Sequence, residues 1–192
     1  MFIIVKELGE PSMKKIFFTV FLLALSCRAY SKDMFLKAGG GFSLPANASG
    51  IYSNGLNSYI AGGLDISKDF AGILSGELNQ FPVVYANPNA GYVGQVWSIM
   101  ASIQFQLLKS NFFRPYLFTG IGLDFYGYQN NGSLGIPSSS YKDYFGFQFG
   151  LGTDLELNKN TYLFIDLKVH FEYVPPILWS FYPILAGLKF DL

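Results

Sequence analysis

His170 is the only histidine of the chain, and charged side chains recur around it at every second position. Asp166, Lys168 and Glu172 lie on its face if the segment is a β-strand, because successive strand residues point to opposite sides. A histidine can take the proton of a serine hydroxyl while a carboxylate orients its ring. Two hypotheses follow: a hydrolase that uses His170 with Glu172, or a set of hydrogen-bonded charges without a catalytic role.

Other patterns of catalytic or ligand-binding residues are weak. One histidine and one cysteine leave only scattered carboxylates as metal ligands. Gly120-Ile121-Gly122 and Gly150-Leu151-Gly152 do not complete the phosphate-binding glycine pattern before a helix. The 13 basic and 13 acidic residues balance, so no positive field is available for phosphates. We therefore expect no metal, no cofactor and no nucleic-acid partner.

The composition points to a β-protein in an apolar environment. Only 14% of the 192 residues are charged, whereas 18% are aromatic and 21 are glycine. A soluble domain usually carries about 25% charged residues, and a disordered chain would lack this many aromatic residues. The length suits a single domain.

The N-terminal segment is typical of a secretory signal peptide. Met13-Lys14-Lys15 precedes the apolar run Ile16–Leu25, which is too short to cross a bilayer as a helix. We expect residues 1–31 to be the signal peptide, cleaved after Ser31, and residues 32–192 to form the barrel described below.

Two details of this segment stay open. Glu7 and Glu10 do not fit the basic start of a signal peptide, which suggests that translation begins at Met13. Cys27 is an alternative, lipidated N-terminus, although Ala24 stands where a leucine is usual. Without a disulfide in the mature chain, stability has to come from backbone pairing.

An alternation of apolar and polar residues follows Ser31 and predicts antiparallel strands. Segments of about ten residues suit tilted strands that cross a hydrocarbon layer. The expected strands are Met34–Leu44, Tyr59–Ser67, Phe70–Gln80, Gln95–Leu108, Pro115–Tyr128, Tyr144–Leu157, Thr161–Tyr173 and Tyr182–Leu192.

The connections between these strands alternate in length. The short ones are Ser67–Asp69, Lys109–Arg114 and Asn158–Asn160. The long ones, rich in turn-forming residues, are Pro45–Ser58, Phe81–Gly94, Gln129–Asp143 and Val174–Phe181. This rhythm is typical of an up-and-down barrel in the bacterial outer membrane, with short periplasmic turns and long outer loops. The predicted fold class is all-β, a closed antiparallel transmembrane barrel of eight strands without a second domain.

One face of each strand is apolar and the other carries the charges. In residues 161–173 the wholly apolar face carries Leu163, Ile165, Leu167, Val169 and Phe171. The charges expected to line the lumen and pair across it are those of Lys37, Glu77, Asp124, Asp166, Lys168, His170, Glu172 and Lys189. An eight-stranded barrel is just wide enough for its own side chains, so we expect no wide pore.

A soluble lipocalin-like barrel is the inverted alternative, because it points its apolar face inward. The glycines favour the membrane barrel, since they gather on the polar face, where a narrow lumen needs room. These glycines are Gly39, Gly41, Gly63, Gly120, Gly122, Gly146, Gly150, Gly152 and Gly187.

Aromatic residues near the strand ends predict two girdles at the membrane interfaces. Those near the long loops include Phe81, Trp97, Tyr126, Tyr173, Trp179 and Tyr182. Those near the short turns are Phe70, Phe112, Phe113, Tyr116, Tyr162 and Phe190.

The C-terminus resembles the signal read by the barrel-assembly machinery, with Gly187, Phe190 and Leu192 at the characteristic positions. Arg114–Gly122 is similar to the start of a central strand in the small outer-membrane barrels of the outer membrane protein A and X type. This resemblance implies an integral outer-membrane location among the lipids of that membrane. It also implies assembly by periplasmic chaperones and the barrel-assembly machinery.

A hydrolase would resemble the lipid A deacylase family, which uses His, Ser and Glu on an eight-stranded barrel. That family's His-x-Ser-Asn signature is absent, because the chain reads His170-Phe171-Glu172-Tyr173. The leading expectation is a non-enzymatic barrel with four surface loops, a structural or adhesin-like role and an extracellular ligand at the loops. The alternatives are a lipid-modifying enzyme and a soluble periplasmic binding barrel.

Overall fold

The computed structural model describes residues 33–46, 52–82, 93–108, 110, 112–129, 142–174 and 177–192. The expected signal peptide, including Met13 and Cys27, lies outside these residues. Eight strands are present: β1 Met34–Pro45, β2 Gly55–Asp65, β3 Phe70–Pro82, β4 Val93–Gln106, β5 Phe113–Gln129, β6 Lys142–Asn158, β7 Thr161–Val174 and β8 Ile177–Asp191. Among the described residues, no helix is long and apolar enough to cross a membrane.

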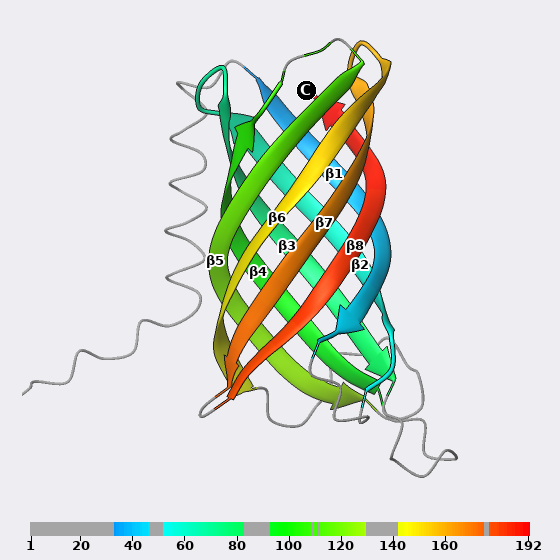
Figure 1. Cartoon of the computed structure of the whole chain (residues 1–192), viewed down its shortest axis with the longest axis vertical. Helices are drawn as coiled ribbons and strands as arrows, with labels where there is room; N and C mark the ends of the chain where they lie inside the picture. Colours follow the sequence, from blue (N-terminus) through cyan, green and yellow to red (C-terminus); the bar gives the residue numbers. More distant parts are fainter. Residues whose placement is uncertain are drawn as a thin grey trace, which may run out of the picture. The chain divides into compact units, whose positions relative to one another are not determined.

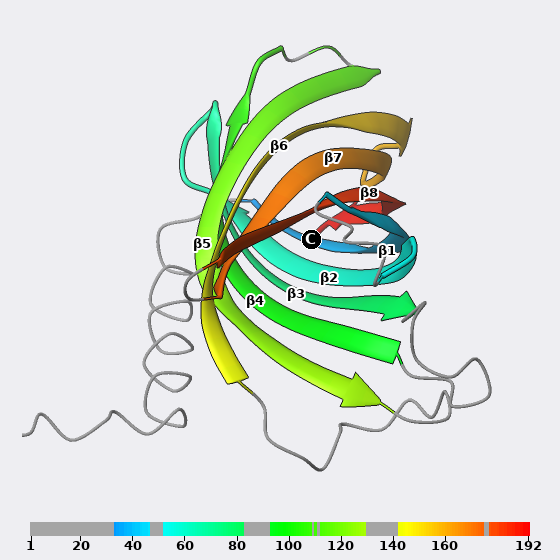
Figure 2. The same ribbon diagram turned by 60° about the horizontal axis from the view of Figure 1, so that its bottom comes forward.

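The strands form a closed antiparallel barrel in which each pairs with its neighbours in the sequence (Figure 1). Closure comes from β1 and β8, whose ladder runs from Phe35 opposite Asp191 to Pro45 opposite Phe181. Figure 2 shows the curved wall that the strands build around the lumen. We call the end with the β2–β3, β4–β5 and β6–β7 connections the turn end, and the opposite end the loop end. The predicted fold class is confirmed.

The fourth long connection was predicted wrongly. Strand β7 runs to Val174 and β8 begins at Ile177, so only two residues separate them, and those lie outside the described residues. The three other long connections lie partly or wholly outside them as well. Pro175-Pro176 explains the error, since two consecutive prolines are typical of a turn and the prediction extended that turn to Phe181. Pro183 lies inside β8 as predicted; it pairs with Ser43 of β1, and the β7–β8 ladder is interrupted beside it.

Side-chain exposure alternates along the strands as the apolar pattern predicts. Apolar side chains on the outer wall include Ile99, Ile103, Leu117, Ile121, Phe145, Phe149, Leu151, Leu167 and Leu188. In β6, Phe149 is 50% exposed, whereas the neighbouring Gln148 is 2% exposed. A soluble lipocalin-like barrel would have the opposite arrangement. The outer wall therefore fits hydrocarbon rather than water.

Glycines make room for large inward side chains. Gly39 and Gly187 face each other across the β1–β8 seam. Phe164 fills the space beside them, and a Cβ atom on Gly187 would lie 2.7 Å from Phe164 Cε1. Gly63 leaves the corresponding space for the Phe35 ring. The lumen is consequently packed with side chains along this part of the wall.

Candidate functional site: the polar lumen and its two ends

All eight side chains expected in the lumen point inward and are buried: Lys37, Glu77, Asp124, Asp166, Lys168, His170, Glu172 and Lys189. They come from β1, β3, β5, β7 and β8. Because burial of an unpaired charge is costly, the partners of each one decide what the site can do.

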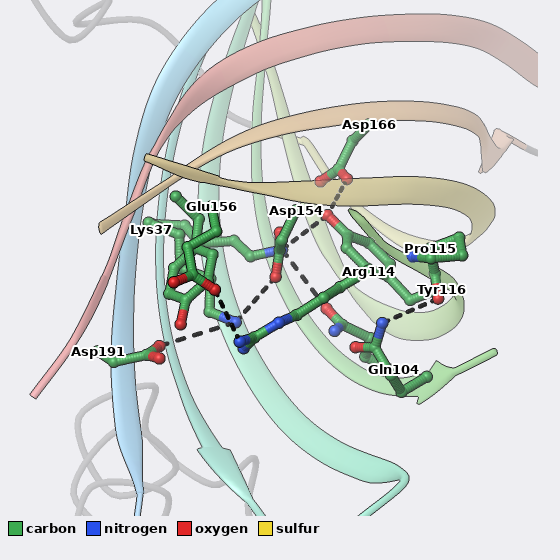
Figure 3. Close-up of polar contacts among 12 residues, drawn as sticks. Lys37, Gln104, Arg114, Pro115, Tyr116, Asp154, Glu156, Asp166 and Asp191 are labelled. Atoms are coloured by element: carbon green, nitrogen blue, oxygen red, sulfur yellow. Dashed lines mark hydrogen bonds and ion pairs between the residues drawn. The ribbon is translucent and has the colours of Figure 1, made fainter. Parts of the chain in front are cut away.

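Near the turn end, one carboxylate holds two lysines. Asp154 of β6 accepts a hydrogen bond from Lys189 Nζ at 2.8 Å, and Lys37 Nζ lies 3.7 Å from its other oxygen (Figure 3). Lys189 also lies 3.8 Å from Asp191 at the strand end. Two positive charges and the adjacent carboxylates thus compensate one another directly.

Tyr116 of β5 joins this group to Asp166. Its hydroxyl donates to Asp166 Oδ1 at 2.5 Å and accepts from Lys37 Nζ at 2.9 Å. Lys37 also donates to Gln104 Oε1 at 3.4 Å and lies 4.4 Å from the Tyr116 ring centroid. Charge-assisted bonds of this kind are about twice as strong as neutral ones.

The middle of the lumen holds a second ion pair. Lys168 of β7 donates to Glu77 of β3, and Asn57 Nδ2 donates to the other Glu77 oxygen at 3.3 Å. Asn57 and Ser43 also donate to Asn79 Oδ1, each at 2.5 Å. Side chains from four strands are therefore tied together across the lumen.

Almost no free space remains in this layer. A cavity of about 10 Å³ lies between Lys37, Tyr116, Gln148, Asp166 and Lys168. This volume holds about one water molecule. Gln148 Nε2 donates to Ser102 Oγ at 3.0 Å on the same level.

Toward the loop end the pairing is incomplete. His170 Nε2 lies 2.8 Å from Asp124 Oδ2, and the His170 ring stacks on Phe181 with centroids 4.6 Å apart. Glu172 is fully buried, and neither of its carboxylate oxygens has a hydrogen-bond partner among the described residues. The neighbouring charged group is Asp124, which is also an acid and therefore supplies no counter-charge for Glu172.

An aromatic layer covers these acids. Tyr52, Phe81, Tyr126, Trp179 and Phe181 contact one another, with the Phe81 and Phe181 rings 5.5 Å apart in an edge-to-face arrangement. The Tyr52 and Tyr126 hydroxyls are hydrogen-bonded to each other. Cross-strand pairing places Trp179 directly beside Glu172.

The girdle prediction was therefore wrong for several residues. Phe81, Tyr126 and Trp179 belong to the inner aromatic layer, and Tyr116 and Tyr162 are buried in the lumen. Because these residues lie near strand ends, the sequence suggested a girdle. Their positions in the alternation of inward and outward residues instead direct their side chains into the lumen. Aromatic side chains that do face outward near the two ends are Trp97, Tyr173 and Tyr182, and Phe70, Phe112, Phe113 and Phe190.

The turn end opens into a polar cavity of about 220 Å³. Arg114 Nη2 and Glu156 Oε2 form a half-buried ion pair 3.2 Å apart at this end (Figure 3). The cavity floor includes Gln104 and Lys189, behind which lies the Lys37–Asp154 group.

The described side chains of the lumen are not arranged as a hydrolase site or a metal site would require. His170 uses Nε2 for Asp124, and its Nδ1 has no partner among the described residues. A serine–histidine pair is thus not formed by the residues described. Within the same part of the chain, no group of three or more His, Cys, Asp or Glu side chains could hold a metal ion.

Similarity to known proteins lies in the fold and not in the sequence. No family model and no curated protein matches the chain. Neisserial surface protein A matches with a TM-score of 0.62 and 15% identity over 82% of this chain and 96% of that chain. The fold is that of a small outer-membrane β-barrel. A major outer membrane protein from Thermus thermophilus matches with a TM-score of 0.57 and 10% identity, over 83% of this chain and 99% of that one.

A third similar structure was solved with a ligand. It is Ail, the attachment invasion locus protein of Yersinia pestis, in complex with the heparin analogue sucrose octasulfate. The TM-score is 0.50 and the identity 14%, over 82% of this chain and 98% of that chain. With its apolar outer wall, this chain has the architecture of an integral outer-membrane protein.

Two residues of the expected assembly signal, Gly187 and Phe190, lie on β8, and Leu192 directly follows this strand. Gly187 points into the lumen, Phe190 faces outward, and Leu192 is exposed at the C-terminus. The charges predicted from the sequence to pair in the lumen did not include Asp154, and Tyr116 was assigned to a girdle. The even spacing of Tyr116 with Gly120 and Asp124 was the signal that could have placed Tyr116 inside.

Proposed function

We propose that the protein is a non-enzymatic barrel of the bacterial outer membrane that acts in envelope structure or surface attachment and forms no wide pore. The observation that carries the last part is the middle layer of the lumen, where interlocked side chains leave room for about one water. A diffusion channel needs a continuous aqueous path, and barrels of 16 or more strands provide one.

Reconstitution tests both the location and the closed lumen. The mature chain should stay in membranes after carbonate washing and show heat-modifiable gel migration. In a planar bilayer it should give no large, steady conductance. Release as a soluble species, or a stable porin-like current, would contradict the proposal.

A surface-attachment role is supported by the composition of the loop-end connections. Residues 46–54, 83–92, 130–141 and 175–176 contain no Lys, Arg, Asp or Glu and are rich in Asn, Ser, Gly, Tyr and Pro. Ail was solved with a polyanion, but these connections supply no cation for one. We therefore favour an uncharged ligand, such as a neutral glycan or a neutral protein surface.

Intact cells that display the protein should bind neutral glycans more strongly than sulfated ones on an array. Replacing residues 130–141 by a short Gly-Ser connection should reduce this binding, while the barrel still shows heat-modifiable migration. Equal binding by displaying and non-displaying cells would refute a neutral glycan as the ligand.

The enzymatic alternative has one specific weakness in the lumen. His170 is fully buried and bonded to Asp124, whereas an enzyme acting on membrane lipid needs a nucleophile reachable from the lipid. Lipid A mass spectra of cells with and without the gene should be identical. A missing acyl chain that depends on His170 would favour the enzyme.

A further inference from the structure

The cavity at the turn end has the features of a binding site for a small zwitterion. Its volume of about 220 Å³ admits several water molecules. It is smaller than the roughly 300–1,000 Å³ typical of sites for drug-sized ligands. Apart from Phe70 and Ala71, its lining is polar. A compact, strongly polar ligand therefore fits it best.

The charges around the cavity are balanced and mixed. Its lining contains the cations Lys68, Arg114 and Lys189 and the acids Asp65, Asp69 and Asp191. A purely anionic ligand would meet three carboxylates, and a purely cationic one would meet three cations. A ligand that carries both charges can place each beside its opposite.

Part of this charge is available to a ligand. Lys68 and Asp69 are exposed on the β2–β3 turn, and Lys68 forms no ion pair with any described residue. Arg114 donates through Nε to Ser110 O at 3.4 Å and through Nη2 to Glu156. Guanidinium has five N–H donors in a fork that suits a carboxylate, so donors remain.

The floor closes the cavity toward the lumen. Lys189 donates a hydrogen bond to Asp154, and Lys37 donates one to Gln104 (Figure 3 labels Lys37, Gln104 and Asp154). These contacts hold two polar side chains in place beneath the cavity. A ligand would enter from the turn end, which faces the periplasm in barrels of this kind.

We propose that this cavity binds a small free α-amino acid, with its carboxylate on Lys68 and Arg114 and its ammonium group on the acids of the rim. The limited apolar lining restricts the ligand to a small side chain. This site is separate from the loop end and independent of the proposed surface ligand.

The test uses the mature chain, isotope-labelled and refolded in detergent micelles. Alanine is titrated to roughly 10 mM, which would nearly saturate a site with a Kd of about 1 mM. We expect saturable shifts of the backbone amides at Ser67, Asp69, Phe70 and Ser110. N-acetylalanine and alaninamide each lack one charge and should bind about two- to fivefold more weakly, as expected for partly exposed ion pairs.

Variants assign the carboxylate contact. Lys68→Gln should weaken alanine binding about two- to fivefold but should not weaken alaninamide binding further, because alaninamide has no carboxylate. Lys159→Gln is the matched control, since it removes a lysine from the neighbouring β6–β7 turn outside the cavity lining. Unchanged spectra elsewhere show that the barrel remains folded.

Three results would overturn the proposal. They are the absence of saturable shifts with alanine, equal shifts with all three probes, and an equal effect of Lys159→Gln and Lys68→Gln.

Discussion

The two halves of the lumen are closed in different ways. In the turn-end half, Asp154 is shared by Lys37 and Lys189, and Asp166 accepts from Tyr116. In the loop-end half, the aromatic layer fills the barrel, and Glu172 lies beneath it without a hydrogen-bond partner among the described residues. In the loop-end half Asp124 is paired with His170, so Glu172 is the acid that lacks a partner among the described residues. The comparison predicts opposite effects for removing Asp154 and for removing Glu172.

Removing the shared acid of the turn-end half should have the largest effect. Asp154→Asn leaves Lys37 and Lys189 without their common counter-charge in a buried site. Breaking a buried ion pair by loss of one partner typically costs about 3–5 kcal/mol. Urea unfolding of the refolded barrel, followed by tryptophan fluorescence, should show this loss. Asp69→Asn on an exposed turn is the control, and a similarly small change for both variants would contradict the assigned pairing.

The outer wall should tolerate charge only near its edges. Phe149→Arg places a charge at mid-height of the wall and should lower the free energy of unfolding by about 2–4 kcal/mol. Leu167→Arg should behave in the same way. Phe190→Arg, near the turn end, should cost only about 0–1 kcal/mol. Equal costs for Phe149→Arg and Phe190→Arg would mean that the wall does not face a hydrocarbon layer.

Removing the unpartnered acid of the loop-end half should stabilise the barrel. Glu172→Met keeps a side chain of similar length and removes a buried carboxyl group that makes no hydrogen bond to a described residue. The expected gain is about 1–3 kcal/mol, the usual cost of an unsatisfied buried group. Glu77→Met is the matched control and should destabilise, because it deprives Lys168 of its partner. Destabilisation by both substitutions to a similar degree would show that the two acids are equivalent.

The alternation of side chains made much of the fold predictable. In β7, the even positions from Phe164 to Glu172 are inward and the odd positions are outward. This pattern follows from local geometry, because strand side chains alternate wherever they occur. The pattern was missed at the start of β8, because Pro175-Pro176 just before it resembles a loop, and the inward positions of Trp179 and Phe181 were therefore assigned to that loop.

The contacts across the lumen could not be predicted in the same way. Asp154 meets Lys37 and Lys189 only because β6, β1 and β8 curve around one narrow space with a particular stagger. That stagger depends on how the whole barrel closes, which alternation within single strands does not determine. For the same reason, the sequence indicated an inward Glu172 but not its lack of a hydrogen-bond partner.

The central claim is that the apolar side of every strand faces lipid and the polar side faces a filled lumen. Single cysteines at Phe149 and Leu151, and at Ser102 and Gln148, test it in the mature chain, since Cys27 is the only native cysteine. Each is labelled with a small fluorophore before the barrel is reconstituted with a bilayer-dwelling quencher. We predict strong quenching at positions 149 and 151 and little at positions 102 and 148. The reverse pattern would contradict the membrane barrel and favour a soluble barrel with an apolar interior.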